Sequence, residues 1–232
     1  MEKKSIGIIG GMGPMATVEL FRLIVANTKS SADQDHIHIY IDNNTQIPDR
    51  TQAILHGGKS PVPEIVASAE KLEQAGADLL LMPCNTSHYF IDEIQRQVSL
   101  KIHNMIEETA AAVYKAGYKK AGLLATTGTV KGRIYEKYSE KYGIEILSPD
   151  FEEQEILMRF IYEGVKAGNT GFDVRGINRV VDSLTKRGAE TIILGCTELP
   201  VGKKMYGLDF ESIDALETLA KSAVVEAGYE LI

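Results

Sequence analysis

The sequence predicts an α/β protein made of two similar domains, each built on a parallel sheet. Short apolar runs that are typical of buried strands alternate along the chain with longer segments of helical periodicity. This alternation is typical of parallel sheets whose strands are joined by right-handed crossover helices. The two halves also look like copies, because residues 7–13 align with 122–128 and residues 79–86 align with 192–197. We therefore expect a duplicated domain.

The elements follow from these runs in chain order. In the first half we expect strands and helices to alternate over residues 5–9, 18–27, 36–41, 63–75, 79–82 and 89–98. In the second half we expect the same alternation over residues 121–125, 131–142, 144–147, 152–165, 177–187 and 191–194, with a final helix over 214–227. Ligands bind beyond the carboxyl ends of the strands in this architecture, so we expect the site in a cleft between two facing domains.

Composition places the chain among ordinary globular proteins. Of its 232 residues, 44% are hydrophobic and 25% are charged, with a net charge of −7. This charge offers no electrostatic surface for nucleic acid or an anionic membrane. The N-terminus lacks the apolar core of a signal peptide, and no apolar run is long enough to cross a bilayer. We therefore expect a cytoplasmic protein whose two cysteines are free thiols rather than a structural disulfide.

The two cysteines are the strongest candidates for chemistry. Cys84 follows an apolar run and Pro83, and it precedes Asn85 and a helical segment. Cys196 follows residues 191–195 in the same way, with Thr197 after it. A helix N-terminus at the end of a strand favours a thiolate. A lone cysteine is more often a buried apolar residue, but two at matched positions of a repeat favour a functional interpretation.

Two turns at matched positions are candidates for anion binding. Residues 11–16 follow a strand and fit the loose dinucleotide-binding pattern, with Pro14 suited to a first helical turn. A carboxylate would use the same backbone N–H groups as a phosphate, and the cysteines favour the carboxylate. In the second half, residues 126–129 form a threonine cluster that we interpret as a helix N-cap. Its hydroxyl groups are also able to donate to a substrate carboxylate.

Basic residues and histidines complete the candidates. Arg50 lies in a turn-like stretch and Lys166 ends a helical run, at roughly corresponding places in the two halves. The alternative for each is a solvated surface charge. His88 lies one helical turn after Cys84, which makes a Cys–His pair conceivable, but a residue that lines or caps the helix is favoured. The other histidines lack metal-ligand spacing, so we expect no metal site.

The ordered motifs resemble those of the aspartate/glutamate racemases, specifically the aspartate racemase branch. These motifs are Gly-Gly-Met-Gly-Pro, Asn43 with Ile-Pro-Asp-Arg, Pro-Cys-Asn-Thr, Thr-Gly-Thr and Gly-Cys-Thr-Glu-Leu. The resemblance covers essentially the whole chain. It implies two pseudo-symmetric domains, at 1–105 plus 210–232 and at 106–209, with the last helix returning to the first domain. It also implies no pyridoxal phosphate or other cofactor, a small amino-acid substrate and a homodimer.

The resemblance also implies a role for each matched residue. Cys84 and Cys196 would be the catalytic pair, and Arg50 and Lys166 would be the basic groups near the pair and the side-chain carboxylate. The α-carboxylate and ammonium of the substrate would be held by Met12, Asn85, Thr86, Thr127 and Thr197. Glu198 is placed with these substrate-binding residues. Two cysteines on opposite faces would let one accept the α-proton while the other returns a proton.

Several alternatives stay open. Glutamate racemases carry an Asp-Ser-Gly motif at the first turn, absent here, and a histidine where this chain has Glu198. Both differences argue against a glutamate racemase, although a racemase of broad specificity shares much of the pattern. A non-catalytic amino-acid-binding module would explain a cleft but not two thiols. A dinucleotide-dependent oxidoreductase would not explain the duplication, and a decarboxylase needs one cysteine rather than two. A cis–trans isomerase on the same scaffold also stays open.

Overall fold

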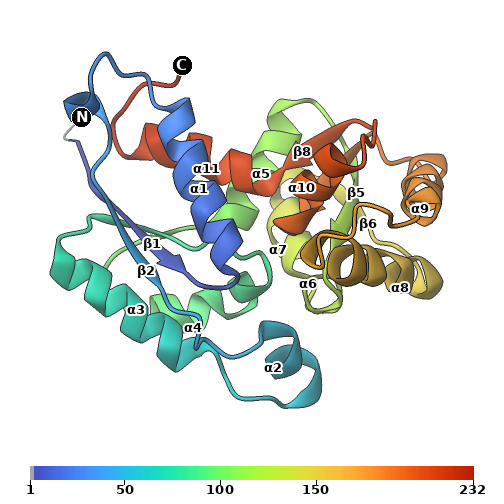
Figure 1. Cartoon of the computed structure of the whole chain (residues 1–232), viewed down its shortest axis with the longest axis horizontal. Coiled ribbons are helices and arrows are strands. Elements are labelled where there is room, and N and C mark those ends of the chain that lie inside the picture. The colour runs from blue at the N-terminus through green and yellow to red at the C-terminus, as the bar shows by residue number, and fades with distance from the viewer. Residues whose placement is uncertain (1–2) are drawn as a thin grey trace. The chain divides into compact units, whose positions relative to one another are not determined.

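The computed structural model describes residues 3–232, and the chain forms two compact units (Figure 1). The first unit contains the chain up to Met105 together with Leu216–Ile232, and the second contains Ile106–Ala215. The sequence-based prediction that the chain returns to the first domain at residue 210 is too early. Residues 212–214 form a strand that pairs with Ile192–Leu194, so this segment belongs to the second unit.

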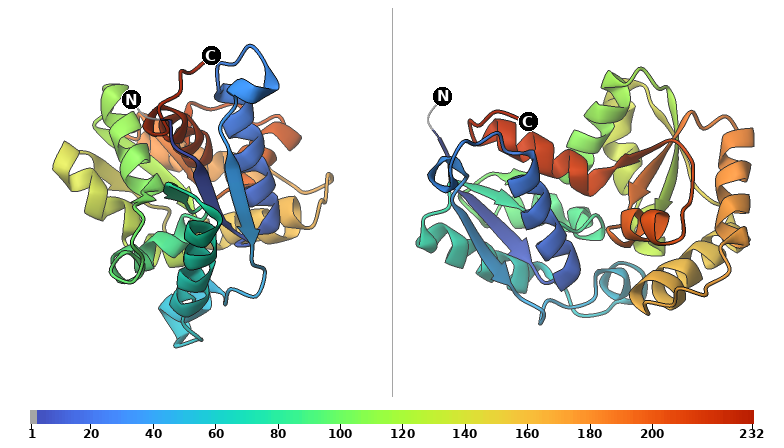
Figure 2. Two further views of the ribbon diagram at one scale, coloured as in Figure 1. Left: turned by 90° about the vertical axis from the view of Figure 1, so that its left-hand side faces the viewer. Right: turned by 45° about the horizontal axis from the view of Figure 1, so that its top comes forward.

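The first unit is built on a four-stranded parallel sheet in the order β2-β1-β3-β4. Its strands are β1 (Ile6–Gly10), β2 (Ile39–Asn43), β3 (Leu79–Leu81) and β4 (Ile102–His103). The connection from β1 to β2 runs one way along the sheet, and the connection from β2 to β3 runs the other way, past β1. Right-handed crossovers therefore place the helices of these two connections on opposite faces of the sheet. The views in Figure 2 show the strands of this sheet with helices around them.

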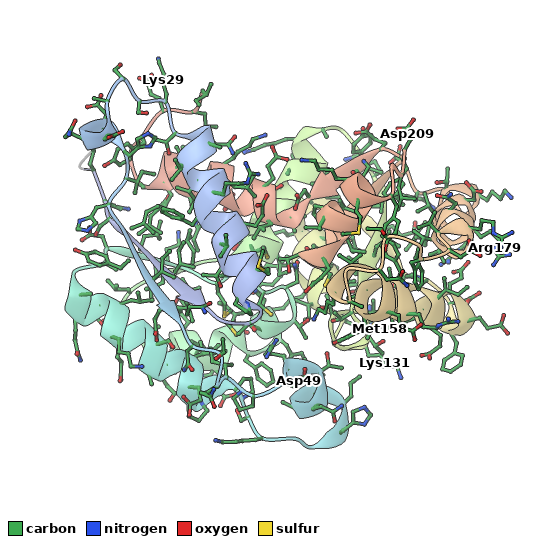
Figure 3. The ribbon with its side chains drawn as sticks, viewed as in Figure 1. Lys29, Asp49, Lys131, Met158, Arg179 and Asp209 are labelled. Atoms are coloured by element: carbon green, nitrogen blue, oxygen red, sulfur yellow. The ribbon has the colours of Figure 1, made fainter. Side chains whose placement is uncertain are left out.

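Local sequence explains where the helices of this unit begin and end. Its helices are α1 (Pro14–Asn27), η1 (Asp33–Asp35), α2 (Arg50–His56), α3 (Val62–Ala75), η2 (Thr86–Phe90), α4 (Ile91–Gln95) and α11 (Ala215–Glu226), the last of which begins one residue before the unit boundary. Pro14 begins α1, where its missing N–H costs nothing. Asp49, labelled in Figure 3, caps α2 by accepting the Gln52 N–H at 2.8 Å. Gly76 ends α3 with a left-handed φ of +104°.

The C-terminal segment completes the first unit. The Lys4 N–H donates to the Ala227 carbonyl at 3.0 Å, and the Lys29 N–H donates to the Glu230 carbonyl at 2.8 Å. Its helix α11 buries a row of apolar side chains, namely Leu216, Leu219, Ala220, Ala223 and Val224. The return of the last helix to the first domain is therefore what the resemblance implied.

The second unit repeats this plan with a parallel sheet in the order β6-β5-β7-β8. Its strands are β5 (Lys120–Ala125), β6 (Glu145–Leu147), β7 (Thr191–Gly195) and β8 (Ser212–Asp214). Its helices are α5 (Met105–Lys115), which begins at the end of the first unit, α6 (Thr127–Lys131), α7 (Ile134–Ser139), η3 (Glu140–Tyr142), α8 (Phe151–Arg159), the π-helix η4 (Phe160–Lys166), α9 (Arg175–Lys186) and α10 (Glu198–Met205). Side chains alternate along its strands, so Ile192 and Ile193 belong to different apolar clusters on the two faces.

Two glycines show that the halves pack alike. A Cβ on Gly7 of β1 would lie 3.1 Å from Leu72 Cβ and 2.9 Å from the Leu80 side chain. A Cβ on Gly122 of β5 would lie 3.2 Å from Leu184 Cβ and 2.7 Å from the Ile192 side chain. Each glycine thus makes room for the helix that precedes the third strand and for a residue of that strand. The alignment of Gly7 with Gly122 therefore has the same packing reason in both units.

The two units also have a carboxylate at the same place, just before the third strand. Asp78 accepts the Ser5 N–H at 2.8 Å, and Glu190 accepts the Lys120 N–H at 2.8 Å, so each ties the start of the first strand of its sheet to that of the third. Asp78 and Glu190 each lie six residues before a cysteine, Cys84 and Cys196. The two cysteines therefore occupy equivalent positions of two copies of one fold.

Candidate active site

Cys84 lies in a short loop between β3 and η2. Its backbone N–H donates to the Met82 carbonyl at 2.8 Å, and its side chain is buried in the same apolar cluster as Met12. Asn85 and Thr86, which come next, are also buried. The sequence predicts a helix N-terminus behind this cysteine, and the structure has the 3₁₀-helix η2 beginning at Thr86.

His88 binds the backbone of this loop rather than the Cys84 thiol. Its Nδ1 lies 2.9 Å from the Cys84 carbonyl oxygen, and its Nε2 accepts the Met105 N–H at 3.2 Å. This arrangement requires a neutral ring with its proton on Nδ1. Burial lowers the pKa of His88 to about 4, although the bond to the Cys84 carbonyl opposes that shift. This geometry agrees with the sequence-based interpretation that His88 lines or caps the helix.

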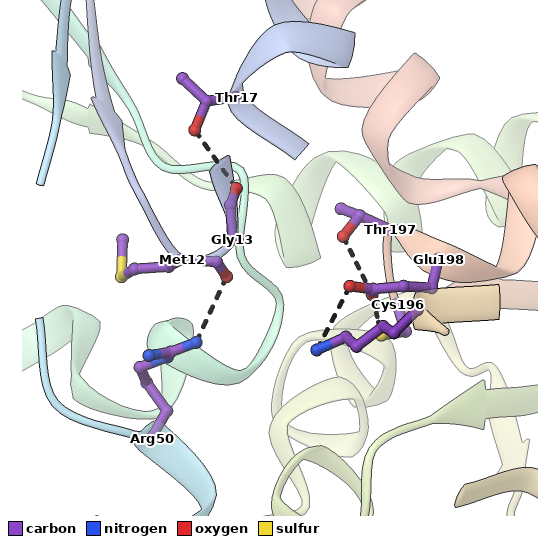
Figure 4. A network of polar contacts seen from close by, with 8 residues as sticks. Met12, Gly13, Thr17, Arg50, Cys196, Thr197 and Glu198 are labelled. Atoms are coloured by element: carbon purple, nitrogen blue, oxygen red, sulfur yellow. Dashed lines mark hydrogen bonds and ion pairs between the residues drawn. The ribbon is translucent and has the colours of Figure 1, made fainter. Parts of the chain in front are cut away.

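Met12 connects the glycine turn to the Cys84 loop and to Arg50. The Ser87 hydroxyl lies 3.2 Å from the Met12 sulfur. Arg50 Nη2 donates to the Met12 carbonyl at 3.3 Å (Figure 4). Arg50 Nη1 donates to the Pro48 carbonyl at 3.0 Å. Arg50 is the first residue of α2 rather than part of a turn.

The Arg50 guanidinium has a buried nitrogen without a partner among the described residues. Its Nε is buried and has no hydrogen-bond partner among residues 3–232. A buried donor without an acceptor is costly, whereas a carboxylate at that place would satisfy it with a charge-assisted bond. The guanidinium is therefore anchored at one edge and able to accept an anionic ligand at Nε.

In the second unit, Thr127 follows β5, the neighbour of the strand that leads to Cys196. Thr126 caps α6 by accepting the Thr129 N–H, which confirms the predicted N-cap. Gln154 donates to the Ala125 carbonyl at 3.0 Å and lies 3.4 Å from the Thr127 hydroxyl. The half-buried Thr127 thus lies at the carboxyl edge of the sheet, where this architecture binds ligands.

Cys196 follows β7 and is the centre of a polar network. Its thiol donates to Glu198 Oε2 at 2.9 Å, and the Thr197 hydroxyl donates to the same oxygen at 3.2 Å (Figure 4). Lys166, the last residue of η4, places its Nζ 3.4 Å from Glu198 Oε1 and 4.6 Å from the centre of the Tyr162 ring. Residues from η4 and from the segment between β7 and α10 are therefore joined through the Glu198 carboxylate.

The electrostatics of this network differ from the sequence-based expectation of a thiolate. Burial, together with the charge of Glu198 and its hydrogen bond, raises the pKa of the Cys196 thiol well above its usual range. Burial also opposes the charge on Glu198, but the Cys196 thiol and the Lys166 ammonium hold the pKa of that carboxyl below its ordinary value. A helix N-terminus alone does not decide the state of a buried thiol that faces a carboxylate.

The structure groups the predicted site residues within each unit. In the first unit, Met12 contacts Arg50 and shares a buried cluster with Cys84. In the second, Thr197, Glu198 and Lys166 gather at Cys196. The predicted set omits Ser87 and Gln154. Ser87 lies in the polar run after Cys84, and that run could have indicated it. Gln154 lies in a predicted helix, where no motif distinguishes it from other polar residues.

Comparisons with known proteins agree with this architecture. The chain is similar to the aspartate racemase of Picrophilus torridus, with a TM-score of 0.86 and 35% identity over 99% of this chain and 96% of that one. It is also similar to an aspartate racemase homologue from Pyrococcus horikoshii OT3, with a TM-score of 0.79 and 28% identity over 97% and 99% of the two chains. A broad specificity amino-acid racemase, RacX of Bacillus subtilis (strain 168), is 28% identical over 94% of this chain and 96% of its own.

Two parallel-sheet α/β units of this kind are the fold of amino-acid racemases, which are isomerases. Residues 9–223 match the model of the Asp/Glu/Hydantoin racemase family, and the chain belongs to that family. Within residues 3–232, no helix is both long and apolar enough to cross a membrane.

Proposed function

We propose that this racemase interconverts L- and D-aspartate by a two-base mechanism in which Cys84 and Cys196 act on opposite faces of the substrate. The observation that carries the proposal is the equivalence of the two cysteines. Each follows the third strand of a four-stranded parallel sheet, and each lies six residues after a carboxylate that ties that strand to the first. Duplicated positions are suited to a reaction in which one group removes a proton and its counterpart returns one.

The chemistry requires one cysteine as thiolate and the other as thiol. The thiolate accepts the α-proton from one face, the thiol gives its proton to the other face, and the two exchange states. Negative charge that develops on the α-carboxylate needs preorganised donors. We propose that the α-carboxylate and ammonium of the substrate are bound by residues at the turns and loops that follow the strands of the two sheets. These residues are Met12, Asn85, Thr86, Thr127 and Thr197.

Arg50 and Lys166 are proposed for the side-chain carboxylate. The buried Nε of Arg50 has no protein acceptor among the described residues, and Lys166 remains partly exposed beside Cys196. A dicarboxylic substrate would supply the charge that these cations match. The similarity to the aspartate racemase of Picrophilus torridus supports the same choice.

A racemase of broad specificity is the competing function, because RacX of Bacillus subtilis is similar over nearly the whole chain. The two are separated by kcat/KM for aspartate, glutamate, alanine and homoserine, measured by resolving enantiomers. We expect aspartate to exceed the uncharged amino acids by roughly tenfold or more, since one charge-assisted contact contributes about 1.5–3 kcal/mol. Equal values for aspartate and alanine would assign the broad specificity instead.

The cysteine pair is tested by Cys84→Ala and Cys196→Ala, with circular dichroism as the control for folding. Both variants are expected to lose racemisation, and the wild-type product formed in deuterated water is expected to carry deuterium at Cα. Ser139→Ala, at a buried hydroxyl in the second unit that the mechanism does not use, is the matched control. Substantial racemisation by either cysteine variant would rule out the two-base scheme.

Three further features are proposed on the resemblance and the chemistry. The reaction needs no pyridoxal phosphate or other cofactor, because two thiols suffice for proton transfer; hydroxylamine should leave activity unchanged. The enzyme acts as a homodimer, which light scattering at several concentrations would test. It resides in the cytoplasm, which cell fractionation would test.

A further inference from the structure

Glu198 differs from the other proposed ligands of the substrate because its carboxylate is already engaged. Oε2 accepts hydrogen bonds from the Cys196 thiol and the Thr197 hydroxyl, while Oε1 faces Lys166. The Glu198 side chain is mostly buried, at 20% exposure. A carboxylate would also repel both carboxylates of an aspartate. These contacts direct Glu198 toward the thiol rather than toward a substrate.

We propose that Glu198 is a positioning residue that keeps Cys196 protonated in the resting enzyme and exchanges a proton with it, rather than a ligand of the substrate. This inference rests on the proposed function, in which Cys196 is one of the two bases. It assigns the thiol state to Cys196 at rest, so Cys196 is the residue that gives a proton in the first turnover of the two-base scheme. Figure 4 shows the Cys196 and Thr197 side chains pointing to Glu198.

The proton transfer balances within the network. When Cys196 must act as a base, its S–H bond breaks and an O–H bond forms at Glu198 Oε2, 2.9 Å away. The pair carries one negative charge before and after this step, and the Lys166 ammonium stays opposite that charge. When Cys196 has given its proton to the substrate and Cys84 has taken the α-proton, the partly exposed Glu198 passes a solvent proton to Cys196 while Cys84 releases its proton to solvent, which restores the resting enzyme.

The first half of the repeat has no carboxylate at the position that matches Glu198. The residue two positions after Cys84 is Thr86, whereas the residue two positions after Cys196 is Glu198. A threonine hydroxyl has no charge and does not ionise near neutral pH, so it does not repel a thiolate as Glu198 does. The two cysteines are therefore equivalent in the fold but differ in the group that controls their proton.

Other charged and titratable groups near Cys196 do not replace Glu198. Lys166 faces it from η4 and favours the thiolate, which is the opposite effect. Tyr135 of α7 is fully buried, hydrogen-bonded to Thr109 and held neutral by a pKa raised by burial. Asp214 of β8 interacts with Tyr135. Glu198 is the group that both contacts the thiol and carries a negative charge.

The experiment measures the titration of Cys196 directly. The chain has two cysteines, so Cys84→Ala leaves Cys196 as the only thiol. With [β-13C]cysteine incorporated, the carbon shift of this single residue is followed against pH by NMR. Adding Glu198→Gln is expected to lower the midpoint and to raise the thiolate fraction at pH 8 by about tenfold, the change produced by roughly one pKa unit. Adding Lys166→Met is expected to raise the midpoint.

Opposite shifts cannot come from a general loosening of the fold, which would move both midpoints toward that of a free thiol. Glu163→Gln is the matched control, because Glu163 lies on the same helix as Lys166 but pairs with Arg159 in solvent. An unchanged or raised midpoint in Glu198→Gln, or shifts of the same sign in both variants, would overturn the proposal. No substrate is present, so this result is independent of whether aspartate is the substrate.

Kinetics give a second readout. Enantiomers have equal free energies in water, so kcat/KM must stay equal in the two directions. Glu198→Gln is expected to change kcat and KM unequally for the two enantiomers, because it shifts the balance between the two protonation forms of the free enzyme. A substrate ligand would instead raise KM for both enantiomers alike.

Discussion

The Nδ1 of His88 lies 2.9 Å from the carbonyl oxygen of Cys84, one helical turn earlier in the chain. The other ring nitrogen accepts the N–H of Met105, where the chain leaves the first unit for the second. One buried, neutral imidazole therefore joins the loop of a proposed catalytic cysteine to the segment where the chain leaves that unit. Its neutrality has a consequence for stability.

We expect stability to fall in acid because of His88. The folded pKa, about 4, lies below the ordinary value of 6.5, so the unfolded chain binds this proton first. The contribution is complete above pH 6.5 and is lost as pH falls toward 4. Between pH 7 and pH 5 the loss is about 2 kcal/mol. Urea unfolding at the two pH values should show a smaller difference for His88→Gln than for the wild type.

The exposed His56 at the end of α2 supplies the control. His56→Gln should keep the pH dependence of the wild type. If His88→Gln also keeps it, the acid sensitivity arises from other groups.

Arg50→Lys tests the planar guanidinium. A lysine cannot reach the Pro48 and Met12 carbonyls with one group while presenting a second donor to the substrate. We expect kcat/KM for aspartate to fall roughly thirtyfold, which corresponds to about 2 kcal/mol. Arg159→Lys, at an exposed ion pair, should leave it unchanged. A proportional fall for alanine would mean that Arg50 does not bind the side-chain carboxylate.

Lys166→Met should move the pH dependence of racemisation. The ammonium lowers the pKa of the Cys196 thiol, so its loss raises that pKa further. Because Cys196 is the partner that must be protonated at rest, the falling limb of the profile of kcat/KM against pH should shift to higher pH. Lys221→Met, which breaks an exposed pair with Glu217, is the comparison. A lower rate with an unshifted profile would restrict Lys166 to substrate binding.

Leu219→Ala should destabilise the first unit. Leu219 of α11 is fully buried, and truncation of such a residue costs about 2–5 kcal/mol. The urea midpoint measured by circular dichroism should fall accordingly. Lys221→Ala on the exposed side of the same helix should change stability by less than about 1 kcal/mol. Equal effects of the two substitutions would show that α11 does not depend on its buried face.

The sequence predicted the long elements and the duplication. Apolar runs such as 191–194 mark buried strands by their own residues, and Gly122 is small because it packs against a neighbouring helix and strand. It missed β4 and β8, which contain only two and three residues and are too short for a periodic pattern. It did not predict α5, nor the change from α8 to the π-helix η4 that brings Lys166 to Glu198.

The sequence named Cys196 and Glu198 as separate candidates and did not predict the contact between them. Motifs identified Cys196 and Glu198, yet their contact depends on the Glu198 side chain folding back at the first turn of α10. That rotamer, and the burial that accompanies it, are properties of packing between η4 and α10. The preference of a helix N-terminus for a thiolate is opposed at Cys196 by burial and by the facing carboxylate of Glu198, and neither effect is legible in the sequence.

The return of α11 to the first unit means that this unit stays incomplete until the last residues of the chain have been synthesised. Its four strands all lie within residues 6–103, but the helix that completes its apolar core lies at residues 215–226. A tag or truncation at the C-terminus would accordingly disturb the unit that carries Cys84, although Cys196 lies much closer to it in sequence.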